Sequence, residues 1–211
     1  MHPVVCMITA SISPEPAAMR ALVDRIRAAA LAGVHLVQVR QHTLGARALT
    51  GLVEQAIDAV RGTQARVVVN DRLDVALAAG AHGVHLRGDS MPGIRARAVA
   101  PSSFLIGRSV HSPLEARQAA AAGGLDYLLY GAVFPTPSKP GATGAGLAGL
   151  AETCTAVALP VLAVGGMSAG RLNGVGRAGA AGFAAIGLFA DCAVDALGPA
   201  VAAAAHVFDT P

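Results

Sequence analysis

Short apolar runs alternate with alanine-rich segments along the whole of this 211-residue chain. The apolar runs are roughly four to eight residues long and are bounded by glycine, proline or charged residues, as buried strands are. Eight strands are predicted in this way, over Val4–Ile8, His35–Arg40, Arg66–Asn70, Gly83–Leu86, Phe104–Arg108, Asp126–Gly131, Val161–Val164 and Phe183–Ile186. The alanine-rich segments repeat their apolar residues with a helical period. They predict helices that include Pro16–Ala32, Ala46–Val60, Pro113–Ala122, Ser168–Arg177 and Val194–Val207.

Alternation of strands and helices over this length predicts an α/β fold, a single (β/α)₈ TIM barrel, with residues 1–211 as one domain. The main alternative is an open, doubly wound sheet. That fold usually carries a glycine-rich fingerprint after its first strand, and the segment from Thr9 to Pro14 has none. The barrel is therefore the favoured architecture.

Composition narrows the class of protein. Apolar residues make up 54% of the chain, yet no run is long enough to span a bilayer, and the first residues do not resemble a signal peptide. The net charge of +3 and the 3% aromatic content argue against nucleic-acid binding. Cys6, Cys154 and Cys192 follow no metal or disulfide spacing, so we expect core-filling thiols and a cytoplasmic protein. Homo-oligomer formation stays open.

Two late predicted strands end in glycine-rich sequence, Leu162–Met167 and Ala178–Phe189. Glycine lets backbone N–H groups approach a ligand closely. In a TIM barrel, the loops after strands seven and eight are the usual phosphate site. We therefore expect Gly165, Gly166 and Gly187 to hold a small phosphorylated molecule.

Polar residues gather at the other predicted strand ends, where a barrel places its chemistry. They are Gln38, Arg40, Asn70, Asp71, His85, Asp89, Ser90, Ser109, His111, Thr136, Ser138 and Lys139. Structural interpretations compete with functional ones. Asn70 and Asp71 could cap the helix that follows, His85 could be a hydrogen-bonded structural histidine, and Asp89 and Ser90 could form a turn. The segment from Thr136 to Gly141 could be an ordinary loop, or its hydroxyls and Lys139 could bind phosphate.

These residues resemble the thiamine-phosphate synthase and TenI family of small TIM barrels. The similarity runs from Val4 to about Phe189. It is carried by segments in the family's order: Val37–Arg40, Val69–Arg72, Gly83–Leu86, Ser109–His111, Asp126–Tyr127, Gly131–Lys139, Ala163–Gly166 and Ala178–Gly182.

In the synthases a pyrimidine-methyl diphosphate loses pyrophosphate, and a thiazole phosphate nitrogen captures the carbocation. The resemblance implies that Arg40, Asn70, Ser109 and Lys139 hold the pyrophosphate, with Arg40 and Lys139 as catalytic cations. It also implies that Asp71 binds Mg²⁺ and that Gln38 lies under the pyrimidine. Thr136 and Ser138, with the backbone of Gly165, Gly166 and Gly187, would hold the thiazole phosphate.

The chain departs from the family pattern in the half of the site that ionises the diphosphate. His42 takes the place of a lysine that contacts pyrophosphate, and Gln41 that of a glutamate. Ser90 takes the place of the second Mg²⁺ carboxylate, unless Asp89 serves through a one-residue shift. Further departures are Thr9-Ala10 after the first strand and Ile186–Phe189 in the late phosphate turn.

TenI-type proteins suggest an alternative activity. They tautomerise a thiazole carboxylate phosphate without a metal, and His111 stands where their histidine is expected. Arg87 and Arg108 could then meet the substrate carboxylate. A third alternative is a regulator that binds a phosphorylated ligand without turnover, because family resemblance alone does not fix activity. Mg²⁺-dependent pyrophosphate release would identify the synthase.

Overall fold

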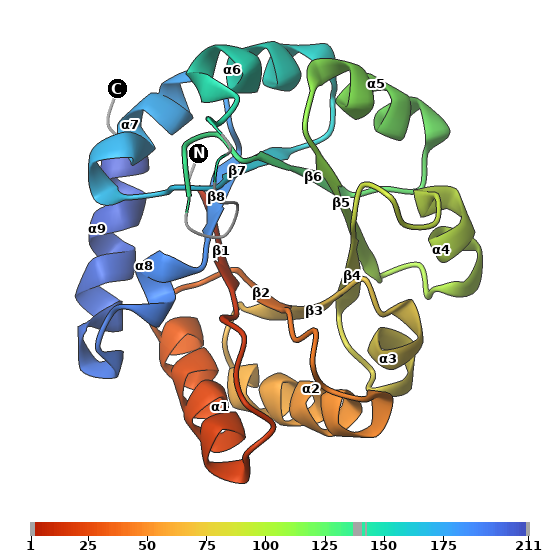
Figure 1. Cartoon of the computed structure of the whole chain (residues 1–211), viewed down its shortest axis with the longest axis vertical. Helices are drawn as coiled ribbons and strands as arrows, with labels where there is room; N and C mark the ends of the chain where they lie inside the picture. Colours follow the sequence, from red (N-terminus) through yellow and green to blue (C-terminus); the bar gives the residue numbers. More distant parts are fainter. Residues whose placement is uncertain (1–2, 137–140, 142, 210–211) are drawn as a thin grey trace.

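The computed structural model describes residues 3–136, 141 and 143–209, and these form a closed barrel of parallel strands in sequence order. The strands are β1 Val4–Ile8, β2 Leu36–Val39, β3 Arg66–Asn70, β4 Gly83–Leu86, β5 Leu105–Val110, β6 Tyr127–Gly131, β7 Val161–Val164 and β8 Gly182–Ala185. β8 pairs with β1 and closes the ring (Figure 1). The prediction of a (β/α)₈ barrel is confirmed.

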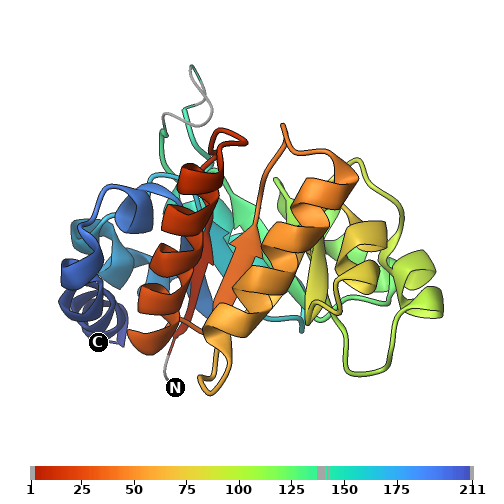
Figure 2. The same ribbon diagram turned by 90° about the horizontal axis from the view of Figure 1, so that it is seen from below.

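Helices surround the barrel (Figure 1) and follow the strands in turn. Figure 2 shows α1 and α2 slanting across one side of it. The helices are α1 Pro16–Leu31, α2 Ala46–Val60, α3 Leu73–Ala78, α4 Gly93–Val99, α5 Pro113–Ala122, α6 Gly146–Ala156, α7 Ala169–Arg177, α8 Gly187–Ala190 and α9 Leu197–Asp209, with a 3₁₀ turn, η1, over Val194–Ala196. Within the described residues, no helix is both long and apolar enough to cross a membrane.

Alternate residues of each strand belong to different cores, because successive side chains of a strand point to opposite faces. In β1, Val5 and Met7 pack in the cluster that also contains helix residues such as Ile26. Cys6 belongs to a second cluster, whose buried members come from the strands alone and fill the barrel interior. Burial raises the pKa of the Cys6 thiol to about 12. The cysteines are free, and Cys6 fills the core as expected.

Several boundaries differ from the prediction by one or two residues. β5 continues through Ser109 and Val110, because both pair with β6. β8 ends at Ala185 because Ile186 has helical backbone angles and precedes α8. The predicted last helix is divided into η1 and α9. These shifts leave the order of the elements unchanged.

Closure of the barrel requires glycine at position 182. A Cβ atom on Gly182 would lie 2.1 Å from the carbonyl oxygen of Val4, on the paired strand β1. We expect Gly182→Ala to lower the free energy of unfolding by about 2–3 kcal/mol, the cost of forcing atoms into a packed interior. Urea denaturation measures this loss. In Gly51→Ala, on α2, the new Cβ meets nothing within 4 Å, and stability should rise instead. Equal behaviour of the two variants would contradict the packing argument.

Candidate active site

One cavity of about 1200 Å³ opens at the carboxyl ends of the strands. It brings together most of the residues selected from the sequence: Gln38, Arg40, His42, Asn70, Asp89, Ser109, His111, Thr136, Gly165, Gly166 and Gly187. Asp71 is not part of this lining, although its neighbour Asn70 is. Ser138 and Lys139 lie outside the described residues.

The floor of the cavity contains a glutamine with one unused polar atom. Gln38, on β2, is 3% exposed and donates through Nε2 to Asn70 Oδ1 at 2.8 Å. Its Oε1 is buried and accepts no hydrogen bond from the described residues. A buried acceptor without a donor costs about 1–3 kcal/mol. Gln38 also lines the cavity, so a shift of its side chain would bring this oxygen to a ligand N–H or O–H group.

A buried histidine lies beside this floor. His85, on β4, contacts Tyr127 Oη through Nδ1 at 3.2 Å and Ser109 Oγ through Nε2 at 2.9 Å. Burial lowers its pKa to about 3, an effect that the nearby Asp71 carboxylate partly opposes. His85 is thus a neutral, hydrogen-bonded histidine that also lines the cavity and orients the Ser109 hydroxyl.

The low pKa of His85 predicts a pH dependence of stability. The unfolded state binds a proton near pH 6.5 and the folded state does not, so stability is complete above that pH and falls as the pH decreases towards 3. At pH 5 the expected loss is about 2 kcal/mol. His85→Gln should remove most of this loss in urea denaturation at pH 7 and pH 5, whereas His206→Gln, on the exposed side of α9, should keep it. Equal pH dependence of wild type and His85→Gln would refute the assignment.

The loop after β1 is anchored by residues that sequence reasoning treated only as departures from a family pattern. Thr9 Oγ1 accepts from the Arg40 backbone N–H at 2.9 Å. The Gln41 side chain donates to Thr9 Oγ1 and the Ala10 carbonyl and accepts from the Ile12 N–H at 3.0 Å. Thr9 and Gln41 are buried, and they fix the backbone that carries Arg40. No local sequence signal marks this contact between distant loops.

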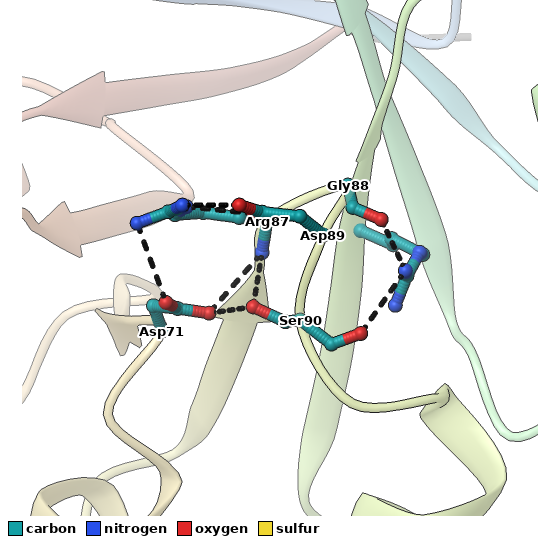
Figure 3. Close-up of polar contacts among 6 residues, drawn as sticks. Asp71, Arg87, Gly88, Asp89 and Ser90 are labelled. Carbon is teal, nitrogen blue, oxygen red and sulfur yellow. Dashed lines mark hydrogen bonds and ion pairs between the residues drawn. The ribbon is translucent and has the colours of Figure 1, made fainter.

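Asp71 is turned towards the loop after β4 (Figure 3). Ser90 Oγ donates to Asp71 Oδ1, the Arg87 backbone N–H lies 3.4 Å from the same oxygen, and Arg87 Nη1 lies 3.8 Å from Oδ2. Asp71 also has a positive φ of 61°. The capping interpretation is not supported, because Arg72 precedes α3 and no side chain of the described residues caps that helix.

The acidic residues determine how a magnesium ion could fit. Asp89 is 71% exposed, and both of its oxygens bind Arg87, at 3.0 and 2.5 Å. Within the described part of the chain, no three histidine, cysteine or carboxylate side chains could hold a metal together. Asp71 and the Ser90 hydroxyl form a small set of hard oxygen donors. Mg²⁺ in nucleotide-type sites is held by one or two carboxylates and mainly by substrate phosphates. The residues present therefore fit an ion that arrives with a diphosphate at the edge of the cavity, next to Asn70 and Arg87, since Asp71 and Ser90 do not line the cavity themselves.

Gly165 and Gly166 follow β7 with positive φ angles of 99° and 65°. Phe134 donates its N–H to the Gly165 carbonyl, and Arg171 Nη1 donates to the Gly166 carbonyl at 2.6 Å. The Arg171 guanidinium also lies over the Phe134 ring, 4.7 Å from its centroid. Arg171, on α7, was absent from the sequence-based selection.

Gly187, the third glycine of the predicted phosphate site, lies at the start of α8. A Cβ on Gly187 would lie 2.9 Å from Asp191 Oδ2, and both residues line the cavity. Since a carboxylate repels phosphate, the side near Gly165 and Gly166 is the more favourable one for an anion.

His111 lies in the loop between β5 and α5. Its Nδ1 is hydrogen-bonded to the Gly131 carbonyl, and its backbone N–H donates to Glu115 Oε2 at 2.8 Å. A carbonyl can only accept, so Nδ1 carries a proton and donates it to Gly131. The arrangement could support acid–base chemistry.

Comparison with known proteins identifies close relatives. The sequence profile described as thiamine monophosphate synthase matches residues 5–189. The thiamine-phosphate synthase of Methanoculleus marisnigri is 43% identical over 164 residues, 77% of either chain. That of Roseiflexus castenholzii is 40% identical over 168 residues, 79% of this chain and 73% of the relative. The solved structure of thiamine phosphate pyrophosphorylase from Pyrococcus furiosus superposes with a TM-score of 0.82 at 31% identity, covering 96% of each chain.

Proposed function

This chain belongs to the thiamine monophosphate synthase family, and we propose that it joins a hydroxymethylpyrimidine diphosphate to a thiazole phosphate and releases pyrophosphate. Its family makes it a transferase of thiamine biosynthesis that acts on small phosphorylated substrates. The observation that carries the proposal is that Gln38, whose Oε1 has no donor among the described residues, lines one cavity together with Arg40 and Asn70. An aminopyrimidine has N–H groups that could satisfy this oxygen.

The first step would break the bond between the pyrimidine methylene carbon and the diphosphate oxygen. The electron pair leaves with pyrophosphate, and the growing negative charge needs fixed cations. Arg40 lines the cavity next to Gln38, and Lys139 is assigned the same role from the sequence alone. Asn70 and Ser109 would orient the diphosphate. His85 would hold the Ser109 hydroxyl in place through its 2.9 Å contact.

Asp71 and Ser90 would hold the Mg²⁺ that enters with the diphosphate. Such an ion supplies positive charge to the leaving pyrophosphate. Asp89, predicted as a second ligand, has both oxygens on Arg87, so its role as a ligand requires that this pair opens.

The second step would form a bond between the methylene carbon and the thiazole nitrogen. We propose that the thiazole phosphate is anchored by Thr136, Ser138 and the backbone of Gly165, Gly166 and Gly187. Thr136 and these glycines line the same cavity as Gln38, so both substrates could meet in one space. Arg171, bound to the Gly166 carbonyl, would stabilise the loop.

The direct test uses purified protein, both substrates, and Mg²⁺ or a chelator. The expected result is thiamine phosphate and pyrophosphate in equal amounts, formed only with the metal. Metal-independent proton exchange on a thiazole carboxylate phosphate would instead identify a TenI-type tautomerase. Binding of a phosphorylated ligand without either reaction would identify a regulator.

The His111 side chain separates the two enzyme activities. In a synthase it only lines the site, so His111→Ala should change kcat/KM for thiamine phosphate formation by no more than about 3-fold, as for a group outside the proton chemistry. In a tautomerase the same variant should lose proton exchange while keeping its affinity for the phosphate. Steady-state kinetics with both substrate sets checks this. A loss of synthase activity of about 100-fold, the scale expected for a group in direct proton transfer, would contradict the assigned role.

A further inference from the structure

Arg87 is the first residue after β4, and its side chain lines the cavity. Arg87 donates two hydrogen bonds to the Asp89 carboxylate, from Nε to Oδ1 at 3.0 Å and from Nη2 to Oδ2 at 2.5 Å (Figure 3). A bidentate pair of this kind fixes the plane of the guanidinium. The remaining nitrogen, Nη1, lies 3.8 Å from Asp71 Oδ2. Asp89 therefore orients Arg87 so that one N–H₂ group faces the carboxylate expected to hold metal.

The loop that carries Arg87 is itself held in place. Arg108, on β5, donates to the carbonyls of Gly88 at 2.5 Å, Ser90 at 3.3 Å and Met91 at 2.9 Å. Arg108 is thus occupied with loop carbonyls, whereas Arg87 directs its charge towards Asp71. Arg108 therefore holds the loop in place, and Arg87 is the arginine of this loop whose charge lies near Asp71.

His42, in the loop after β2, adds no positive charge beside Arg87. Burial and the charges of Arg40 and Arg87 lower the pKa of His42, and Asp71 opposes them only in part. His42 is therefore uncharged near pH 7. Arg40 and Arg87 supply positive charge to the cavity, together with Arg108, whose guanidinium is bound to loop carbonyls.

We propose that Arg87 is a diphosphate ligand that shares the Asp71 carboxylate with the metal ion. Without ligand, Nη1 of Arg87 pairs with Asp71. When a diphosphate binds, Nη1 turns to a phosphate oxygen, and Asp71 becomes available to the accompanying Mg²⁺. The separation of 3.8 Å is an ion pair beyond hydrogen-bond distance, and half-exposed pairs of this kind are weak, so the exchange costs little. This inference rests on the proposed function.

The proposal predicts that Arg87→Gln changes the affinities for pyrophosphate and for Mg²⁺ in opposite directions. Arg87→Gln removes a cation from the diphosphate, so metal-free pyrophosphate binding should weaken about 10-fold, the usual effect of one charge-assisted hydrogen bond. The same change removes a cation from Asp71, so the affinity for Mg²⁺ alone should rise. A residue with only a structural role would not shift the two affinities in opposite directions.

The chain offers a matched control one loop earlier. Arg72 forms the same bidentate pair with Asp74, two residues further on, at 2.9 and 2.6 Å, but it does not line the cavity. Titration calorimetry with inorganic pyrophosphate in chelator, and separately with Mg²⁺ alone, would compare wild type, Arg87→Gln, Arg87→Lys and Arg72→Gln. Arg72→Gln should match wild type in both titrations. Arg87→Lys keeps the charge and should lie between wild type and Arg87→Gln.

The outcomes separate the inference from the proposed function. A wild-type protein that binds no pyrophosphate, with or without Mg²⁺, would count against the proposed function itself. If the wild type binds pyrophosphate and Arg87→Gln binds it equally well, the role of Arg87 is overturned while the function stands. If pyrophosphate binding weakens equally in Arg72→Gln and Arg87→Gln, the effect comes from general surface charge and the inference is overturned. Unchanged or weaker Mg²⁺ binding by Arg87→Gln would overturn the sharing of Asp71.

Discussion

Gln38→Met is expected to lower kcat/KM for thiamine phosphate formation about 100-fold while leaving the fold as stable as before, since losing a buried hydrogen bond to substrate has effects of this size. Methionine nearly preserves the volume of glutamine but has no amide. The variant removes Oε1, the buried acceptor that has no donor among the described residues. It also removes the 2.8 Å bond to Asn70.

The stability of the same variant makes the test specific. An unsatisfied buried acceptor destabilises the free protein, whereas the bond to Asn70 stabilises it, so the two losses should nearly cancel and leave the Tm almost unchanged. Steady-state kinetics and thermal denaturation together check both expectations. Gln55→Met is the control, because Gln55 is exposed and its amide donates to the Gly51 carbonyl of its own helix at 3.0 Å. A Gln38→Met enzyme with wild-type kinetics would remove the main support for the pyrimidine site.

Gly166→Ala is expected to reduce kcat/KM for the thiazole phosphate by about 100-fold, mainly through KM, because misplacing a substrate anchor by a fraction of an ångström has effects of this order. A Cβ at this position would lie 2.6 Å from the Pro135 carbonyl oxygen and 2.8 Å from Phe134 Cβ. The loop that lines the cavity would therefore have to shift.

Gly80→Ala is the matched control for backbone strain. Gly80 has φ +66°, against +65° for Gly166, but a Cβ there meets no atom of the described residues within 4 Å. Both variants carry the strain of an L-residue in the left-handed region, about 1–2 kcal/mol. Only Gly166→Ala should change the kinetics, measured by varying the thiazole phosphate at saturating pyrimidine diphosphate. Similar KM values for the two variants would show that the phosphate site does not need glycine at position 166.

Much of the fold was predictable from the sequence because a barrel repeats one local unit. Apolar runs such as Val161–Val164 form strands that are buried on both faces, and their hydrophobicity is visible without any partner. Helix beginnings such as Pro16 and Pro113 were predicted for the same local reason. The ends of β5 and β8 were not, because pairing with β6 and the backbone turn at Ile186 set them.

The candidate site was also predictable only in part from the sequence. Parallel strands bring their carboxyl ends to one rim, so polar residues at those ends, such as Gln38, Asn70 and Ser109, could be assigned to one cavity in advance. The contact of Thr9 with Gln41 joins two loops that are distant in sequence, and the contact of Arg171 with Gly166 joins helix α7 to the loop before it. No periodicity marks such contacts.

By itself, therefore, the sequence determined the barrel, its family and the set of polar residues at its rim, since these depend on local pattern and strand order. The tertiary structure alone decided how those residues are used. It left Gln38 Oε1 without a donor among the described residues, neutralised His85 by burial, and turned Asp71 towards Ser90 and Arg87. Each of these depends on the direction of a side chain and on what surrounds it, and packing sets both.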